Sequence, residues 1–311
     1  MRRAMVDLKT INFMAARHVA AVVSIALMVI SIGALAIRGL NFGLDFTGGT
    51  LVELSYSEAA PLEKIRHTLR QAGYERANVV NLGAASDVAV RLPTSTDRNV
   101  GHELVDVLQK DVKGTITLRR VEFVGPQVGD DLRQQGGLAV LLSLLAVGTY
   151  IAVRFQYKFS LGAVVGLFHD VIVVLGCFAL FQWEFDLTVL AAVLAVIGST
   201  VNETIVVYDR IREVFRKMRK IDTAEIINIS LTQTLDRTIG TKVTLLLTLI
   251  ALLVFGGEMI RGFSIALTIG TVFGIYSSSY VAASFLMLMK VTREDLLVTP
   301  VQKEGATDGR P

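Results

Sequence analysis

Residues 187–208 read LTVLAAVLAVIGSTVNETIVVY, an apolar stretch with a single acid, Glu203, that runs into the basic segment 209–220. About 20 residues of helix cross the hydrocarbon core of a bilayer, so this stretch is long enough to span one. An ionisable side chain at that depth costs several kcal/mol unless it is paired, hydrated or protonated. The stretch therefore predicts a membrane helix, and Glu203 is a candidate proton site.

The composition is also that of a membrane protein. Hydrophobic residues make up 52% of the 311 residues and charged residues 19%, a balance that is unusual for a soluble domain. The single cysteine, Cys177, excludes a disulfide framework and a cysteine-rich metal site. The net charge of +3 is too small to indicate a nucleic-acid partner.

Six stretches are long and apolar enough to cross a bilayer, and all five prolines lie outside them. We therefore predict a polytopic α-helical membrane protein with six transmembrane helices. The predicted spans are Val19–Ile37, Gly136–Val153, Phe159–Phe181, Leu187–Tyr208, Thr238–Gly256 and Gly262–Met289. The first span could be a signal peptide, but its 19 uncharged residues exceed the usual apolar core of about 7 to 15 residues, so an uncleaved anchor is predicted.

The short loops predict the orientation. Arg154 and Lys158 follow the second span and six Arg or Lys residues lie in 209–220, whereas the loops on the other side hold one cation, Arg261. Because cytoplasmic loops carry the excess of positive charge, both termini are predicted to be cytoplasmic.

Two cytoplasmic segments follow from this orientation. Residues 209–237 are predicted to form a basic loop. Within it, Asp222-Thr223-Ala224-Glu225 resembles a capping box and begins an amphipathic helix. This segment is predicted to lie on the membrane surface, or the charges of the loop only set the topology. Residues 1–18 form the cytoplasmic N-terminus, and 290–311 form a tail that is predicted to be disordered.

The one large segment outside the bilayer, 38–135, is predicted to be a periplasmic α+β domain. Its apolar alternation and helical spacing give the order βαββαβ, a ferredoxin-like split unit. The expected elements are Thr50–Tyr56, Pro61–Gln71, Val79–Leu82, Val88–Leu92, Asp97–Gln109 and Thr115–Phe123. No catalytic constellation is present in it, so we do not expect an enzyme.

Polar residues inside the predicted spans form two groups. Gly198, Ser199, Asn202 and Glu203 fall on one side of the fourth helix, where small residues admit a neighbouring helix and the polar ones can bind the carboxyl or a water. The other group, His169-Asp170, lies in the middle of the third span. Adjacent helical side chains point about 100° apart, which disfavours a metal site. A structural hydrogen-bonded pair and a proton relay both stay open.

Five segments together carry a resemblance to a known family. They are Gly43-Leu44-Asp45-Phe46-Thr47-Gly48-Gly49-Thr50, His169-Asp170, Asn202-Glu203-Thr204 with Asp209-Arg210-Ile211-Arg212-Glu213, Gln233-Thr234-Leu235-Asp236-Arg237-Thr238, and Phe255-Gly256-Gly257-Glu258. The chain resembles the SecF family of the bacterial SecD-SecF protein-export complex, within the resistance-nodulation-division superfamily. The resemblance covers about residues 10–290, and Gly43, Asp45, Phe46, Gly48 and Gly49 are its motif residues outside the spans.

The resemblance implies a subunit of the inner membrane that uses the proton gradient to promote preprotein translocation. SecD would be its partner, and the two would form a pseudo-symmetric bundle of twelve helices beside the SecYEG channel, with YajC and YidC as further neighbours. Unfolded preprotein and membrane lipid are the other expected contacts, and the coupling ion is the proton, with no other cofactor. In the family the acid of the Asn-acid-Thr motif and the arginine before the fifth span conduct protons, which points to Glu203 and Arg237 here. A fixed structural ion pair is the alternative.

Two residues depart from the family pattern. Glu203 replaces the usual aspartate, which keeps the titrating group but lengthens the side chain. Lys242 lies where a serine is expected, in Thr241-Lys242-Val243-Thr244. We predict that Lys242 extends to the cytoplasmic surface. Alternatively it pairs with Glu203 and keeps that carboxyl ionised, which would place proton coupling in doubt.

Gly270 and Gly274 form a Gly-x-x-x-Gly pair in the sixth span and are predicted to pack against another helix, with SecD as the expected neighbour. Two rival functions remain from the sequence. The chain could be a non-conducting structural subunit of the same complex, or half of a proton-driven small-molecule exporter.

Overall fold

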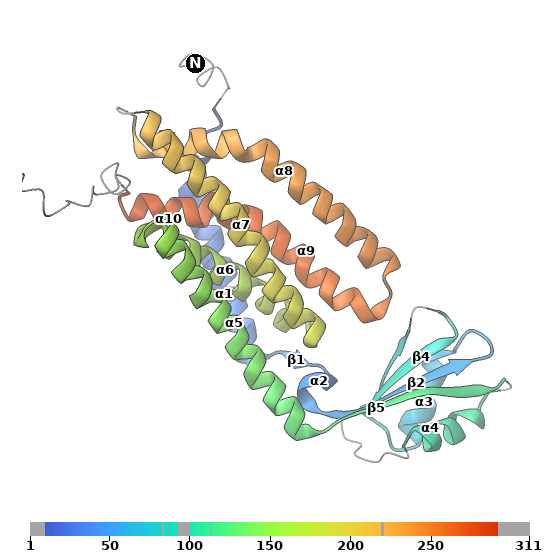
Figure 1. Ribbon diagram of the computed structural model, residues 1–311. Coiled ribbons are helices and arrows are strands. Elements are labelled where there is room, and N and C mark those ends of the chain that lie inside the picture. Colours follow the sequence, from blue (N-terminus) through green and yellow to red (C-terminus); the bar gives the residue numbers. More distant parts are fainter. Residues whose placement is uncertain (1–9, 83, 93–99, 113, 219–220, 292–311) are drawn as a thin grey trace, which may run out of the picture.

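The computed structural model describes residues 10–82, 84–92, 100–112, 114–218 and 221–291. A bundle of long helices carries a small α+β domain at one end (Figure 1). Helix α1 begins and helix α10 ends at the end of the bundle farthest from that domain (Figure 1). The predicted fold class, a helical membrane protein with one α+β domain, is confirmed.

The described residues contain six helical segments long and apolar enough to cross a membrane. The sixth is built from four pieces: a 3-10 turn, η2, precedes α9, and a short π-helical turn, η3, joins α9 to α10. The helices are η1 Phe13–Ala16 with α1 Arg17–Ile37, α5 Pro126–Arg154, α6 Tyr157–Phe181, α7 Leu187–Lys217, α8 Thr223–Phe255, and η2 Glu258–Ile260 followed by α9 Arg261–Tyr276, η3 Ser277–Ala282 and α10 Ala283–Leu288.

Three helices extend beyond the predicted spans. Helix α5 begins at Pro126 instead of Gly136, with proline at its first position, where a missing N–H costs nothing. Helix α7 continues to Lys217 and α8 begins at Thr223.

The predicted loop over 209–237 is therefore too long at its beginning, where α7 continues to Lys217, whereas the helix predicted to begin at Asp222 is confirmed. Glu213 pairs with Arg210 and with Lys217 one turn away, and such pairs support a helix outside the bilayer. Asp222 accepts a hydrogen bond from Ala224 N and caps α8. The amphipathic segment is the first part of α8, and its Ile227 is fully buried, so it packs in the bundle instead of lying alone on a membrane surface. Arg219 and Lys220 lie outside the described residues, as do the predicted tail after 291 and the chain before Thr10.

The α+β domain has the predicted order βαββαβ. The sheet runs β3-β4-β2-β5 with antiparallel neighbours, the order of a ferredoxin-like unit. Helices α3 and α4 supply Ile65, Leu69 and Leu104 to the core beneath the sheet. The predicted first residues of the second helix, 97–99, lie outside the described residues. The elements are β2 Gly49–Tyr56, α3 Leu62–Gln71, β3 Asn78–Asn81, β4 Asp87–Leu92, α4 Val100–Gln109 and β5 Ile116–Val124.

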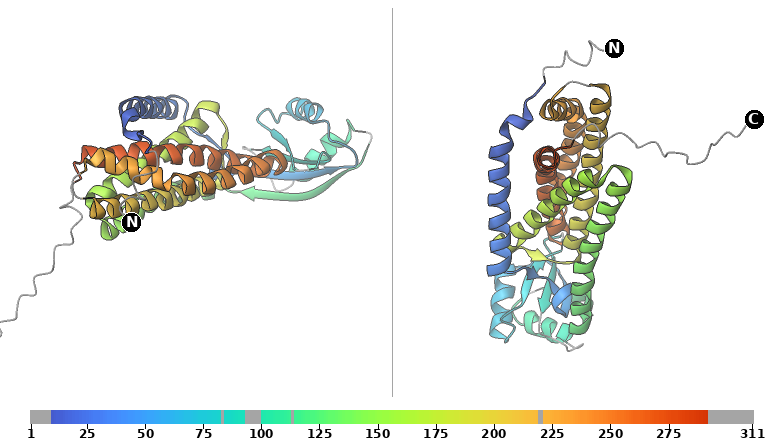
Figure 2. Two further views of the ribbon diagram at one scale, coloured as in Figure 1. Left: turned by 90° about the horizontal axis from the view of Figure 1, so that it is seen from above. Right: turned by 90° about the vertical axis from the view of Figure 1, so that its left-hand side faces the viewer.

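A second, two-stranded sheet lies where the domain meets the bundle. Strand β1, Asn41–Phe42, pairs in parallel with β6, Glu184–Phe185, which directly precedes α7. The short helix α2, Leu44–Thr47, follows β1 and contacts α5. Figure 2 shows α1 along one edge of the bundle. The α+β domain lies at the end of the bundle where α5 and α7 begin.

Candidate functional site

Glu203 and Lys242 form a buried ion pair between α7 and α8. Lys242 Nζ lies 2.9 Å from Glu203 Oε2, and the two residues are 5% and 7% exposed. Each charge alone would be costly inside a membrane, so each stabilises the other. The prediction that Lys242 extends to the surface is wrong, because its ammonium is buried against the Glu203 carboxylate, which is the alternative that the sequence left open.

The Glu203 carboxylate has unused capacity for hydrogen bonds. The hydroxyls of Thr238 and Ser278 face it, but within the described part of the chain neither oxygen accepts a hydrogen bond of normal geometry. A buried polar atom without a partner is costly. The geometry therefore leaves Oε1 open to a proton or a water molecule.

A small cavity of about 170 Å³ lies beside the ion pair and brings several predicted residues together. Ser199, Asn202 and Arg237 line it together with Glu203 and Lys242. Arg237 is exposed and, among the described residues, forms no ion pair with Glu203, whose charge partner is Lys242. Arg237 is thus near the site and accessible from outside this chain.

Gly198 occupies a different face of α7. A Cβ atom built on Gly198 would meet nothing within 4 Å, and the residue is exposed. Within this chain it packs against no described helix, so the close packing predicted for it would need another subunit.

His169 and Asp170 form a second buried polar pair, on α6. His169 Nδ1 lies 3.2 Å from Asp170 Oδ1, and Ser277 donates a hydrogen bond of 2.7 Å to the other carboxylate oxygen. The residues are 3% and 0% exposed. His169 Nε2 is buried and has no partner within the described chain, so the pair is incompletely satisfied.

The π-helical turn η3 links the two buried acids. Its first residue, Ser277, binds Asp170 and the next, Ser278, faces Glu203. Irregular turns of this kind are rare and are frequent at functional sites. The sequence analysis did not assign these serines a role, although a run of three serines in an apolar span was the available signal.

Gly270 and Gly274 pack against α7 of the same chain, which corrects the prediction that another subunit is their neighbour. A Cβ on Gly274 would lie 2.8 Å from Thr200 Oγ1, and one on Gly270 would lie 3.0 Å from Val196 Cβ. Both distances are too short for a side chain, so glycine permits the close approach of α9 to α7. Thr200 also faces Asp170.

The motif residues between Gly43 and Gly49 form the joint between the α+β domain and the bundle. Asp45 Oδ2 accepts a hydrogen bond of 3.0 Å from Leu187 N, at the beginning of α7, and Phe46 stacks on Phe185 with ring centroids 5.8 Å apart. Gly48 has φ of 72°, and a Cβ there would lie 2.8 Å from the Pro126 backbone, so glycine is required. The joint therefore connects the domain to both α5 and α7.

Two oppositely charged side chains meet at this joint. Arg91 of β4 pairs with Glu184 of β6, two residues that the sequence analysis did not connect. Burial raises the pKa of the Glu184 carboxyl, and the nearby Arg91 guanidinium opposes that rise. The domain thus contacts the segment that leads directly into the helix carrying Glu203.

Two family models match the chain. The model "Protein export membrane protein SecD/SecF, C-terminal" matches residues 104–292, and the model "SecD/SecF GG Motif" matches residues 33–60. The chain belongs to the SecD/SecF family. The glycine joint described above lies inside the second match, and both buried pairs lie inside the first.

Named relatives of this SecD/SecF family member agree over nearly the full length. Protein translocase subunit SecF of Pseudomonas aeruginosa is 51% identical over 98% of this chain and 99% of its own length. The subunit of the same name from Escherichia coli O157:H7 is 40% identical over 96% of this chain and 94% of its own length.

Solved structures agree with the fold. The crystal structure of SecDF from Thermus thermophilus, a translocon-associated membrane protein, matches with a TM-score of 0.80 and 33% identity over 91% of this chain. A structure of SecDF in a super-membrane-facing form matches with a TM-score of 0.70. The chain spans 39% of the length of each of these SecDF chains.

Proposed function

We propose that this chain is a SecF-type subunit that works with SecD to promote export of unfolded preproteins through the SecYEG channel. The full-length similarity to translocase subunits named SecF supports this assignment. A SecDF chain contains a region like this one within 39% of its length, which fits a separate SecD partner here. YajC and YidC are proposed as further neighbours.

The proposed location is the cytoplasmic membrane, with both ends of the chain on the cytoplasmic side and the α+β domain on the periplasmic side. The arginines and lysines of 209–220 support this orientation. Helices α1 and α10 have their chain ends on the side of the bundle away from the domain (Figure 1), as this orientation requires.

The buried pair Glu203–Lys242 carries the mechanistic part of the proposal. A proton that binds Glu203 neutralises it and leaves Lys242 as a buried cation without a partner. Breaking a buried pair in this way costs about 3–5 kcal/mol, whereas a proton gains about 2.3 kcal/mol per 100 mV of membrane potential. A proton-motive force of about 150–200 mV therefore matches the cost, so proton passage can alternate the paired and unpaired states.

The unpaired state would change how α7 packs against α8. Glu203 lies about 24 Å along α7 from Leu187, at 1.5 Å per residue, and Leu187 N is bound by Asp45 of the joint. Because α7 is a continuous helix between these points, a shift at Glu203 moves the joint and the α+β domain. The domain would then grip or release preprotein on the far side of the membrane.

The other predicted residues receive supporting roles. Asn202 and Arg237 line the cavity beside Glu203 and would deliver protons to it from its exposed side. His169 and Asp170 would respond to the same proton through Ser277 and Ser278 of η3. No cofactor other than the proton is invoked.

A second candidate function is favoured by the 2.9 Å ion pair itself. If Lys242 keeps Glu203 ionised under all conditions, this chain is a structural subunit and SecD alone couples to the gradient. The small-molecule exporter has no comparable support, because one small α+β domain is the extramembrane part described.

Proton flux and preprotein transport in proteoliposomes that contain the chain with SecD and SecYEG test the proposal. Glu203→Gln should abolish the gradient-dependent part of transport while the ATP-driven part continues. Glu213→Gln is the matched control, since Glu213 lies on the same helix but is a surface residue with its side chain 41% exposed. Gradient-dependent transport by Glu203→Gln at the level of the control would support the structural subunit.

A further inference from the structure

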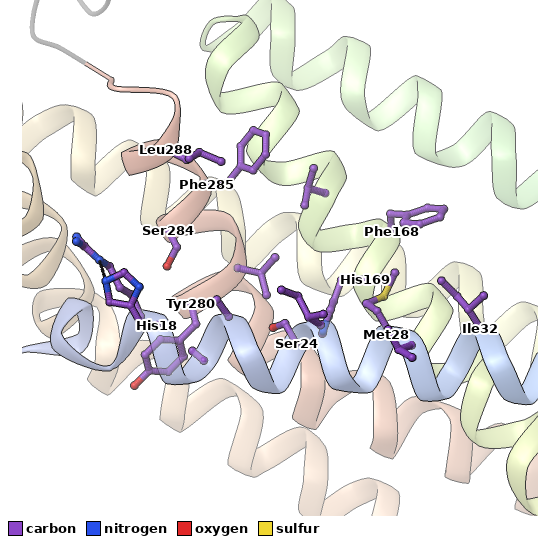
Figure 3. A pocket seen from close by; sticks show the side chains of 17 residues that line it. His18, Ser24, Met28, Ile32, Phe168, His169, Tyr280, Ser284, Phe285 and Leu288 are labelled. Carbon is purple, nitrogen blue, oxygen red and sulfur yellow. Dashed lines mark hydrogen bonds between the residues drawn. The ribbon is translucent and has the colours of Figure 1, made fainter.

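A long groove of about 490 Å³ lies between α1 and the elements α6, η3 and α10 (Figure 3). Its volume is in the range of pockets that hold small ligands. The walls are mainly hydrocarbon, with Met28 and Ile32 on α1, Phe168 on α6, and Phe285 and Leu288 on α10. Figure 3 shows these side chains arranged along one side of α1.

The occupant of this groove must itself be hydrocarbon. A water molecule needs two to four polar partners, which these walls do not offer over most of their length. The groove follows α1 from His18 to Ile32, about 21 Å at 1.5 Å per residue. One leaflet contributes about 15 Å of hydrocarbon, so the groove is long enough to hold a lipid acyl chain that enters from one membrane surface.

One end of the groove is positively charged. Arg17 and His18 line that end, and Arg17 donates to His18 Nε2 at 3.3 Å and to the Met287 sulfur at 3.7 Å. Within the described ranges Arg17 has no acidic partner, so no described acid compensates its charge.

The Arg17 guanidinium presents a rigid fork of N–H donors, an arrangement that favours phosphate. Helix α1 continues the preceding helix η1, where the backbone N–H of Arg17 donates to Met14 O, so the charged end is formed by side chains.

We propose that this groove binds an anionic phospholipid of the cytoplasmic leaflet. One acyl chain would lie between α1 and α6, and the phosphate would contact the side chains of Arg17 and His18. The leaflet follows from the orientation proposed above, but lipid binding itself does not depend on proton coupling. His169 lies in the floor of the groove, so the bound chain would also keep water from its ring.

Native mass spectrometry of the full chain purified with SecD tests the charged end. The complex is titrated with phosphatidylglycerol and with phosphatidylcholine of the same acyl chains. Phosphatidylglycerol should bind more tightly, and Arg17→Gln should weaken its binding about fivefold, because one cation near a membrane surface contributes about 1 kcal/mol. Arg38→Gln is the matched control at the opposite end of α1, outside the groove.

A second pair of variants tests the hydrocarbon part. Ala21→Trp fills the groove, whereas Val22→Trp places the same side chain on a neighbouring position of α1 that does not line it. Only the first should reduce phosphatidylglycerol binding. Equal binding of the two lipids, an unchanged Arg17→Gln variant, or equal effects of the two tryptophans would each overturn the proposal.

A photo-crosslinking residue in place of Met28 identifies the occupant in the membrane. An adduct with the mass of a phospholipid is the expected result. An adduct with a helix of SecD, or no lipid adduct, would show that the groove is an interface between subunits or is unoccupied by lipid, and would overturn the proposal.

Discussion

Replacing Lys242 by methionine removes the cation of the buried ion pair and keeps most of the length of the side chain. Glu203 is 7% exposed and would have no charge partner within the described residues, since its ion pair is with Lys242. Removing one member of a buried pair costs about 3–5 kcal/mol. The carboxyl can avoid part of this cost by taking up a proton, which for an ordinary glutamate costs about 3.7 kcal/mol at pH 7.

The expected loss of unfolding free energy for Lys242→Met is therefore about 3–4 kcal/mol at pH 7. The folded variant would hold a proton that the unfolded chain has released, so its stability falls as pH rises. The loss should shrink by about 1.4 kcal/mol for each pH unit between pH 7 and pH 5. Denaturant titration in mixed micelles at several pH values measures both quantities.

Two further variants make this measurement decisive. Lys217→Met removes a lysine whose side chain is 50% exposed and which pairs with Glu213 at 2.5 Å on the surface, and it should cost less than about 1 kcal/mol. Glu203→Gln combined with Lys242→Met should recover most of the lost stability, because no buried charge is left unpaired. A loss below about 1 kcal/mol that does not change with pH would refute the assignment of a buried ion pair.

Three other predictions concern the α+β domain and its joint. Gly48→Ala should lower the melting temperature more than Gly39→Ala, because both have positive φ but only a Cβ on Gly48 would meet the Pro126 backbone; equal effects would contradict the close contact. The Tyr56 hydroxyl is buried without a partner and burial raises its pKa to about 12, so its contribution to stability is present below about pH 10 and is lost as pH rises through 12. Tyr56→Phe should remove that alkaline loss of stability and raise the free energy of unfolding by about 1 kcal/mol, as measured by denaturant titration. An alkaline transition that is unchanged in Tyr56→Phe would show that another group causes the loss. The pKa of the Glu184 carboxyl is raised in the folded chain. The backbone amides of the joint should therefore be most protected from hydrogen exchange below about pH 4.3, and this protection should fall as pH rises through the pKa of Glu184 in the folded chain. Hydrogen exchange of residues 184–190, corrected for the intrinsic rate, should show this for the native chain and not for Glu184→Gln.

The number of spans, the fold class and the family followed from the sequence. Apolar stretches of about 20 residues indicate membrane helices because the bilayer imposes that length on any chain. Alternation along 50–56 and helical spacing around Leu69 and Leu104 indicate which faces are buried, because strand and helix periods are local properties. Glu203 was identified for the same reason, as a polar residue in an apolar run.

The helix ends were predicted less well, because hydropathy reports only the part of a helix inside the hydrocarbon. Helix α7 continues to Lys217 through pairs of charged residues. Helix α8 begins at Thr223 with a capping aspartate, as the capping-box pattern predicted, but the membrane span alone was placed from Thr238. These segments have low hydropathy but are helical through local hydrogen bonds and ion pairs.

What only the tertiary structure decided is which side chains meet. The sequence offered two cations near Glu203, Arg237 before the fifth span and Lys242 inside it. Packing of α8 on α7 directs Lys242 to the carboxylate at 2.9 Å, while Arg237 stays exposed. The neighbours of Gly270 and the link from Ser277 to Asp170 depend in the same way on the rotation of each helix about its axis. That rotation is set by side chains on several helices at once, so no single stretch of sequence contains it.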